Sequence, residues 1–264
     1  MNSNNKKLKI AIVYDMLYPF NIGGAEIRNY EIAKILAKKH DVHLIGIKLW
    51  KGKQIIKKNR ITYHGVCNYK NMYNFSGKRN ITEPIYYSIR LFFYLLKHRF
   101  DIIDVSSFPY FPIISCKLYS IIKKVPLIIT WHEVWIEYWY EYLGNIKGFL
   151  GRIIEKITTK LTKNMIAVSD HTKKRLEKIN VPKKNIHIIY NGVDIKKIDK
   201  IKPQKEKFEI IYTGRLLKHK KIDLLIKAIA LIKKNYPKIK TIITGDGPEL
   251  KRLKLLSLKL LELK

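Results

Sequence analysis

Two glycine-containing turns, far apart in the chain, carry the groups of this sequence best suited to bind phosphate. Gly23 and Gly24 open a predicted helix near the start, and Gly214 with Arg215 follows an apolar run near the end, with Lys220 at the head of the next helix. Amides at a helix N-terminus, a forked guanidinium and a mobile ammonium are all common ligands of anionic oxygens. The two turns therefore predict a phosphate-bearing ligand.

Both turns also have a plain structural explanation. A glycine pair alone makes an ordinary tight turn, and the three-glycine fingerprint of dinucleotide sites is absent. Lysines are so frequent around Lys220 that its position could arise by chance. Taken singly, the two turns leave both interpretations open.

A histidine stands directly after another predicted strand. Thr130-Trp131-His132-Glu133 ends an apolar run, which places His132 at the carboxyl edge of a parallel sheet, where ligands bind. A lone histidine there is either a catalytic group or a structural hydrogen-bonding residue. The residues that follow, through Tyr142, are rich in aromatic side chains, which suit a sugar or lipid pocket and equally suit ordinary packing.

Apolar runs alternate with amphipathic segments along most of the chain. The predicted strands are 8–14, 41–47, 61–66, 101–105, 125–130, 165–168, 186–189, 208–213 and 239–244. The predicted helices are 23–39, 84–98, 109–123, 148–163, 170–178, 220–235 and a leucine-rich segment after Pro248. Strands that alternate with helices predict a doubly wound parallel sheet.

A polar, lysine-rich stretch separates two predicted units. We expect an N-terminal domain over residues 1–194, a linker over 195–207 and a partial C-terminal domain over 208–264. The last unit has only two predicted strands and two helices, too few to bury both faces of a parallel sheet. The predicted fold class is α/β with two Rossmann-like domains, the first nearly complete and the second incomplete.

The net charge of +32 favours an anionic partner without choosing one. Of the 53 basic residues only nine are Arg, and the lysines are spread over the whole chain beside many Ile, Asn and Tyr. That pattern is typical of a coding bias, and attraction to an anionic membrane is the other explanation. No zinc finger, basic recognition helix or stacking motif indicates nucleic acid, so no nucleic-acid partner is expected.

The sequence also indicates where in the cell the protein acts and whether it needs a metal or cofactor. The N-terminus has no signal-peptide core, and no apolar run is long enough to span a bilayer. The two cysteines lack ligand spacing, and no metal or cofactor motif is present. We expect a cytoplasmic protein, with peripheral contact to the inner face of the cell membrane as a further option, and neither a metal nor a cofactor.

In their order along the chain, the motifs resemble those of the family-4 glycosyltransferases of the GT-B fold. They are Gly-Gly-Ala-Glu at 23–26, Thr-Trp-His-Glu at 130–133, Ala-Val-Ser-Asp at 167–170, Asn-Gly-Val-Asp at 191–194, Tyr-Thr-Gly-Arg-Leu at 212–216 and Gly-Asp-Gly-Pro at 245–248. The resemblance covers nearly the whole chain and is most specific in Asn-Gly-Val-Asp at the domain junction, followed about twenty residues later by Gly-Arg-Leu. It implies that the N-terminal domain is the acceptor side and the C-terminal domain the donor side.

The resemblance implies a retaining transferase that moves a sugar from a nucleoside diphosphate to a glycan, lipid or other acceptor without a metal. Arg215 and Lys220 would neutralise the leaving diphosphate, and the glycine pair would approach the phosphates or the acceptor. His132 would sit beside the sugar as the catalytic residue. The residues implied to bind the donor are Gly23, Gly24, Asn191, Arg215 and Lys220.

Two departures from the family pattern stand out. Lys221 replaces the glycine that follows the lysine in the family, and the glutamate pair found further along the second domain is missing. We expect activity to be impaired by truncation. The alternatives are a non-catalytic saccharide- or membrane-binding remnant, one subunit of a split transferase whose partner chain supplies the missing strands, and an unrelated nucleotide-binding protein of the same fold class.

Overall fold

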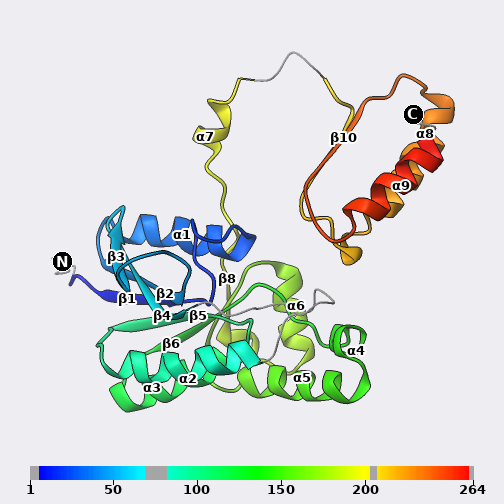
Figure 1. Cartoon of the computed structure of the whole chain (residues 1–264). Coiled ribbons are helices and arrows are strands. Elements are labelled where there is room, and N and C mark those ends of the chain that lie inside the picture. Colours follow the sequence, from blue (N-terminus) through cyan, green and yellow to red (C-terminus); the bar gives the residue numbers. More distant parts are fainter. Residues whose placement is uncertain (1–5, 69–81, 203–206, 262–264) are drawn as a thin grey trace. The chain divides into compact units, whose positions relative to one another are not determined.

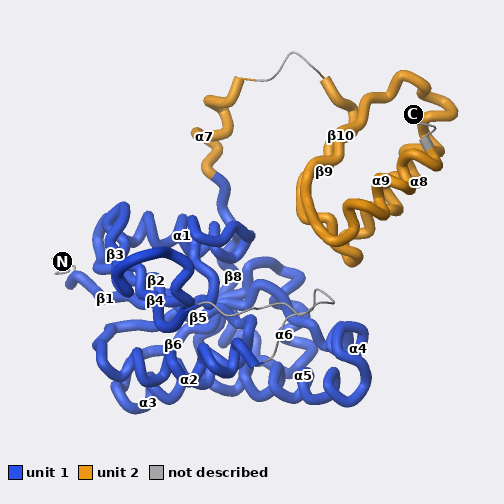
Figure 2. Tube along the Cα trace, in the orientation of Figure 1, with its two compact units in different colours: residues 1–193 blue, residues 194–264 orange. Residues whose placement is uncertain are grey.

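The chain divides into two compact units, Met1–Val193 and Asp194–Lys264 (Figure 2). The computed structural model describes residues 6–68, 82–202 and 207–261. Residues 203–206 of the expected linker therefore lie outside the described residues. The expected domain boundaries, and the acceptor and donor sides given to the two domains, stay predictions.

The first unit is built on an eight-stranded sheet with the order β3-β4-β2-β1-β5-β6-β7-β8. Its strands are β1 (Lys9–Val13), β2 (Asp41–Lys48), β3 (Ile55–Lys58), β4 (Ile61–Asn68), β5 (Ile102–Ser106), β6 (Leu127–Trp131), β7 (Asn164–Ala167) and β8 (Ile186–Ile188). All neighbouring strands pair in parallel except β3, which pairs antiparallel with β4 at the edge. The carboxyl ends of the parallel strands therefore share one edge of the sheet.

Helices cover both faces of this sheet. They are α1 (Gly24–Leu36), α2 (Thr82–Leu96), α3 (Phe111–Lys123), α4 (Tyr138–Leu143), α5 (Asn145–Thr158) and α6 (Asp170–Lys178). Figure 1 shows α1 on one face and α2, α3 and α5 on the other. The start of α6 is set locally, because the Ser169 side chain accepts a hydrogen bond of 3.1 Å from the backbone N–H of Thr172.

Alternate residues of the central strand β1 belong to two separate hydrophobic cores, one on each face of the sheet. Ala11 and Val13 pack in the cluster that contains α2 and α3, whereas Ile10 and Ile12 pack in the cluster under α1. Successive side chains of a strand point to opposite faces, so an unbroken apolar run is what a strand covered on both sides requires. The short run Lys-Ile-Ala-Ile-Val thus explains why β1 lies in the middle of the sheet.

The second unit contains a two-stranded parallel sheet of β9 (Ile210–Thr213) and β10 (Thr241–Thr244). The helices α8 (Ile222–Asn235) and α9 (Leu250–Leu261) belong to it, as does the short helix α7 (Ile195–Asp199). Its core cluster has four buried residues, Leu216, Ile222, Ile226 and Leu253. This core is much smaller than either core of the first unit.

The structure confirms the α/β fold class and adds three elements to the sequence prediction. β3 is an antiparallel edge strand in a sheet predicted to be wholly parallel, and its four residues include two lysines, so no apolar run marks it. α4 lies within the aromatic stretch, and α7 lies within the expected linker. None of the described helices has the length and apolar character needed to span a bilayer.

Candidate functional site

The carboxyl edge of the first sheet gathers polar groups from three neighbouring strands. Ser106 ends β5, His132 follows β6, and the loop after β1 leads to the glycine pair at the start of α1. Because β1, β5 and β6 are consecutive in the sheet, these segments meet at one place. Ligands of open α/β sheets bind at such an edge.

The two glycines play different structural roles. Gly23 is the N-cap of α1 and has extended backbone angles; a Cβ there would stand 2.4 Å from the Glu26 carboxylate. Gly24 is exposed, and a Cβ there would meet nothing within 4 Å. The fold therefore explains a glycine at 23 and leaves the glycine at 24 without a packing reason.

His132 is half-buried and held by hydrogen bonds at both ends. Its Nε2 lies 3.4 Å from the Ser106 hydroxyl, and its backbone carbonyl accepts a hydrogen bond of 3.4 Å from the Thr172 hydroxyl. Burial lowers the pKa of His132 to about 4, and the nearby Arg28 charge acts in the same direction. The imidazole is therefore neutral at neutral pH and available as a hydrogen-bonding group.

Arg28, which the sequence reasoning did not single out, is the most unusual residue at this edge. It is only 7% exposed, yet none of its three guanidinium nitrogens has a hydrogen-bond partner among the described residues. Burial lowers its pKa, and the charge of Asp104 on β5 partly offsets this effect. A buried cation with unused donors is costly unless something anionic pairs with it.

Asn29 links the first helix to the histidine. Its amide donates to the Ser106 hydroxyl over 3.2 Å, and Ser106 is the partner of His132.

Asp104 lies on β5, the strand that Ser106 ends. It accepts a hydrogen bond of 2.7 Å from the Thr130 hydroxyl, and burial raises the pKa of its carboxyl. Polar residues at 26, 28 and 29, on the first turns of a helix after a glycine pair, are the sequence signal that could have revealed this group.

The loop after His132 is fixed by two charged side chains. The buried Glu155 carboxylate accepts hydrogen bonds from the backbone N–H groups of Trp135 (2.7 Å) and Ile136 (2.9 Å) and from the Tyr110 hydroxyl (2.7 Å). Arg175 donates to the carbonyl of Val134 over 2.6 Å. These bonds fix the position of the backbone at residues 134–136, where the aromatic stretch begins.

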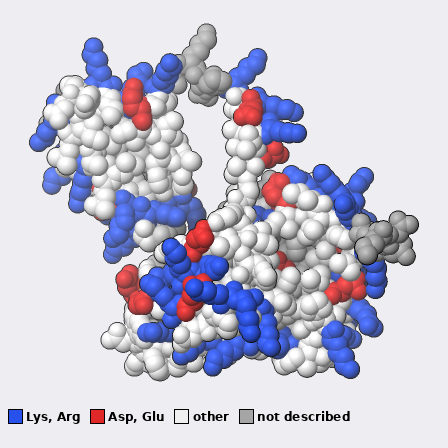
Figure 3. Space-filling view, turned by 180° about the vertical axis from the view of Figure 1, so that it is seen from behind, with Lys and Arg blue, Asp and Glu red and all other residues white. Residues whose placement is uncertain are grey.

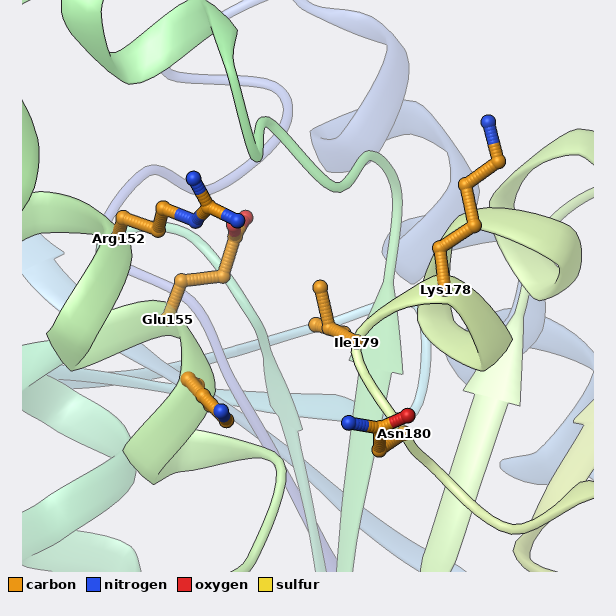
Figure 4. Close-up of a pocket in the computed structure, with 6 residues that line it drawn as sticks. Arg152, Glu155, Lys178, Ile179 and Asn180 are labelled. Atoms are coloured by element: carbon orange, nitrogen blue, oxygen red, sulfur yellow. The ribbon is translucent and has the colours of Figure 1, made fainter.

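A small hollow beside Glu155 is lined by residues of α5 and of the end of α6 (Figure 4). Arg152 and Glu155 stand on one side, and Lys178, Ile179 and Asn180 on the other. Its volume of about 160 Å³ is below that of a ligand pocket. Glu155, the one carboxylate that lines it among the described residues, is already bonded to the loop.

Asn191 is not brought into the first site by any described contact. It lies exposed in the irregular segment between β8 and α7, close to the boundary between the two units. The nearest capping interaction belongs to Asp194, whose carboxylate accepts a hydrogen bond of 3.1 Å from the backbone N–H of Lys197.

In the second unit, two glycine turns are joined at the carboxyl ends of β9 and β10. Gly214 donates its N–H to the Thr244 carbonyl over 3.1 Å. Gly245 has a φ of +147°, and a Cβ there would stand 1.9 Å from the Gly214 carbonyl oxygen. Glycine at 245 is therefore a structural requirement of the paired turns.

The two predicted diphosphate ligands lie on one connection of this unit. Arg215 follows Gly214 directly, and Lys220 lies in the 3₁₀ turn Lys218–Lys220 just before α8. Both are exposed, and neither forms a salt bridge in the part of the chain that the structure describes. The cations are thus accessible to an anion.

No group of three or more potential metal ligands occurs among residues 6–68, 82–202 and 207–261. The residues predicted at the site offer backbone amides, an imidazole, an amide and two cations, which suit an anionic ligand. The expectation that no metal and no cofactor takes part stays a prediction.

The fold is that of the GT-B glycosyltransferases, and comparison with known families agrees. A model described as Glycosyltransferase Family 4 matches residues 22–197, and one described as Glycosyl transferases group 1 matches residues 194–263. The chain belongs to glycosyltransferase family 4. A comparison with curated protein sequences gave no match.

Several solved structures share the fold. HepE of Anabaena in complex with UDP has a TM-score of 0.68 at 18% identity, over 96% of this chain and 66% of that chain. The lipopolysaccharide outer core galactosyltransferase WaaB has a TM-score of 0.57 at 14% identity, over 96% and 65% of the two chains. TarM has a TM-score of 0.67 at 13% identity, over 98% and 76%. The chain thus spans about two thirds of the length of HepE and WaaB.

Proposed function

We propose that the protein transfers a sugar, with retention, from a nucleoside diphosphate sugar to a glycan or lipid acceptor. The observation that carries the proposal is the pair of family matches, which together extend over residues 22–263. The neutral, half-buried His132 and the exposed pair of Arg215 and Lys220 support it, because each offers the interaction that this reaction needs.

The leaving diphosphate is the part of the reaction that the second unit suits best. As the glycosidic bond breaks, negative charge accumulates on the phosphate oxygens, and cations that are already in place stabilise it. Arg215 offers a forked set of donors and Lys220 a mobile point charge. We assign both to the diphosphate, which makes a metal unnecessary for this step.

The first unit suits the sugar and the reacting centre. His132 can exchange a hydrogen bond with a sugar hydroxyl without carrying a charge. Gly24, which has no packing reason to be glycine, would let a ligand approach the N-terminus of α1 closely. Asn191 is assigned to the donor as well, on the strength of its place in the Asn-Gly-Val-Asp motif.

A uridine nucleotide is the donor we propose to test first. The HepE structures are described as complexes with UDP, with UDP-glucose, and with UDP and glucose, and that protein shares the fold of this chain. We further propose that the protein acts in the cytoplasm, in contact with the anionic inner face of the cell membrane.

Thermal denaturation with nucleotide sugars tests donor binding. A donor at about 100 times its Kd adds about 2.7 kcal/mol to the free energy of unfolding, so the melting temperature should rise by several degrees. Arg215→Ala should abolish the rise, whereas Lys227→Ala, which removes an equally exposed cation from α8, should leave it intact. Equal responses of the two variants would contradict the role given to Arg215.

Turnover tests the reaction itself. NMR of the product should show the same anomeric configuration as the donor, and inversion would refute retention. Donor binding without transfer to any glycan or lipid acceptor would favour the alternative of a non-catalytic binding module or one subunit of a split enzyme.

A further inference from the structure

Three helices on one face of the first sheet expose apolar residues to solvent. α2, α3 and α5 cover the same face (Figure 1). The exposed apolar residues are Ile85, Ile89 and Phe93 on α2, Ile114, Leu118, Ile121 and Ile122 on α3, and Ile146, Phe149, Leu150, Ile153 and Ile157 on α5. Spacings of three and four residues place them in one stripe on each helix. We call these residues the apolar stripes.

The exposed charges on these three helices have one sign. The basic residues of the three helices are Arg90, Lys117, Lys123, Lys147, Arg152 and Lys156. Their only acidic residues are Glu83 and Glu155, and both are buried. Figure 3 shows basic and uncharged side chains along the lower edge of the first unit, where Figure 1 places these helices.

Two of the four buried residues of helix α5 are glycines, at its N-terminal half. A Cβ on Gly148 would stand 2.7 Å from the Trp139 carbonyl oxygen, and one on Gly151 would stand 2.5 Å from the Trp139 ring. α5 therefore packs tightly against α4 through its glycines. Its large apolar side chains, such as Phe149, which is 55% exposed, are left on the solvent side.

An apolar cavity of about 400 Å³ opens in the same layer, within the size range of small-molecule sites. It lies between α4, α5 and the starts of α2 and α3, and its lining residues are Pro84, Phe108, Pro109, Tyr110, Phe111, Trp139, Tyr142, Leu143, Lys147, Leu150, Gly151 and Ile154. Leu150 belongs both to the cavity wall and to the stripe on α5. Lys147 is the one charged side chain of the lining among the residues that the structure describes.

The cavity is connected through the chain to the candidate site. Phe108 stands two residues after Ser106, the partner of His132, and stacks on Trp135 with ring centroids 4.9 Å apart. Trp135 in turn lies 4.6 Å, centroid to centroid, from Trp139 in the cavity wall. A molecule in the cavity would therefore lie against the aromatic segment that follows His132.

We propose that the apolar stripes dock on an anionic membrane and that the cavity takes a hydrocarbon chain of a phosphate-bearing lipid, which is the acceptor. The naming of the acceptor rests on the proposed transferase function, whereas docking and chain binding do not. Three helices that combine apolar stripes with basic residues, and that carry no exposed acid of their own, match an anionic lipid surface on both counts. A protein partner with an acidic, apolar face is the alternative that the test must distinguish.

Vesicle sedimentation of the full chain, without nucleotide sugar, tests the docking. Binding to vesicles of phosphatidylglycerol should be at least ten times tighter than binding to neutral phosphatidylcholine. The double variant Phe149→Gln and Ile153→Gln should weaken it at least tenfold. Ile35→Gln, which removes an exposed apolar residue from α1 on the opposite face, should change it less than twofold. Equal binding to both vesicle types, or equal loss in the stripe variant and the Ile35→Gln control, would overturn the proposal.

Lipids brominated on their chains test the cavity through tryptophan fluorescence, because Trp139 is the one of the four tryptophans that lines it. Quenching should be strong in the wild type and should fall at least twofold in Ile154→Phe, which fills the cavity with a larger side chain. The same variant should keep its vesicle binding and its far-ultraviolet circular dichroism. Unchanged quenching in Ile154→Phe would refute chain entry.

The two proposals fail separately. A chain that binds UDP-sugar in the thermal assay but does not bind anionic vesicles would disprove the docking and leave the transferase function standing. Vesicle binding with no response to any nucleotide sugar would disprove the transferase function and leave the docking standing.

Discussion

At the scale of single residues, the first site is dominated by a buried guanidinium that has no hydrogen-bond partner among the described residues. Arg28 lies buried beside Asp104 and His132, and it helps to keep the imidazole neutral. Because a buried cation disfavours a second one nearby, the protonation of His132 reports on Arg28 directly.

We expect Arg28→Gln to raise the pKa of His132 from about 4 toward its ordinary value of 6.5, because the Arg28 charge is one of the two causes that lower it. The pKa is measured by NMR of the imidazole ring. Arg28→Lys, which keeps the charge, and Lys38→Gln, which removes an exposed cation just after α1, should leave it low. An unchanged pKa in Arg28→Gln would show that burial alone is responsible.

Lys221 occupies a backbone conformation that favours glycine. Its φ of +54° and ψ of +36° lie in the left-handed region, where a side chain costs about 1–2 kcal/mol. Lys221→Gly should therefore raise the free energy of unfolding of the chain by up to about 1 kcal/mol, after the larger chain entropy of glycine is subtracted.

Chemical denaturation of the chain measures this gain. Lys218→Gly is the matched control, because Lys218 stands three positions earlier and is not among the residues with positive φ. It should destabilise the chain or leave it unchanged. A loss of stability in Lys221→Gly would mean that the lysine side chain contributes more than its backbone strain costs.

At the scale of elements, two buried histidines connect β2 to β4. Nδ1 of His43 lies 2.7 Å from Nε2 of His64, and Nδ1 of His64 lies 2.7 Å from the hydroxyl of Tyr94 on α2. Burial lowers the pKa of both imidazoles, that of His64 to about 3. The other charged or titratable groups that act on the pair are Asp41, Lys9, Lys57 and His98.

We expect acid to destabilise the first unit through this pair. His64 binds a proton near pH 6.5 in the unfolded chain and only near pH 3 in the folded chain. The free energy of unfolding is therefore highest above about pH 7 and falls as the pH decreases from 6.5 to about 3. His64 alone should remove about 2 kcal/mol between pH 7.5 and pH 5.

Urea unfolding at the two pH values measures this loss. His64→Asn, which cannot be protonated, should flatten the dependence, whereas His187→Gln, at an exposed position on β8, should not. If His64→Asn keeps the full pH dependence, another group is responsible.

At the scale of the whole molecule, the two units differ in how much core each one has. The first unit holds two clusters of buried residues, one on each face of its sheet, whereas the core cluster of the second has four buried residues. Stability of a small unit depends on the apolar surface it buries, and fewer than about 80 residues rarely bury enough.

We therefore expect a fragment of residues 1–193 to unfold in one cooperative transition and a fragment of residues 194–264 to show none. Circular dichroism during heating measures both. A cooperative transition in the second fragment would show that its small core suffices, and a first fragment that fails to fold would show that its two cores depend on the second unit.

The order of elements could be read from the sequence because its determinants are local. The apolar run of β1 requires cover on both faces, and Ser169 caps α6 within one turn, so strand and helix positions follow from neighbouring residues. The glycines at 214 and 245 were visible as turns for the same reason. The family relationship also follows from sequence, because the motif order along the chain and the family matches agree.

Other features depend on residues that only the tertiary structure brings together. Arg28 is buried because β5 and the loop after β6 lie beside α1, and the apolar cavity forms from four separate segments. β3 is a strand only because β4 offers it an edge. The sequence by itself determined most of the elements, their order and the family, since these depend on short-range patterns. The tertiary structure decided which charges are buried and where the cavity lies, because burial depends on contacts between residues far apart in the chain.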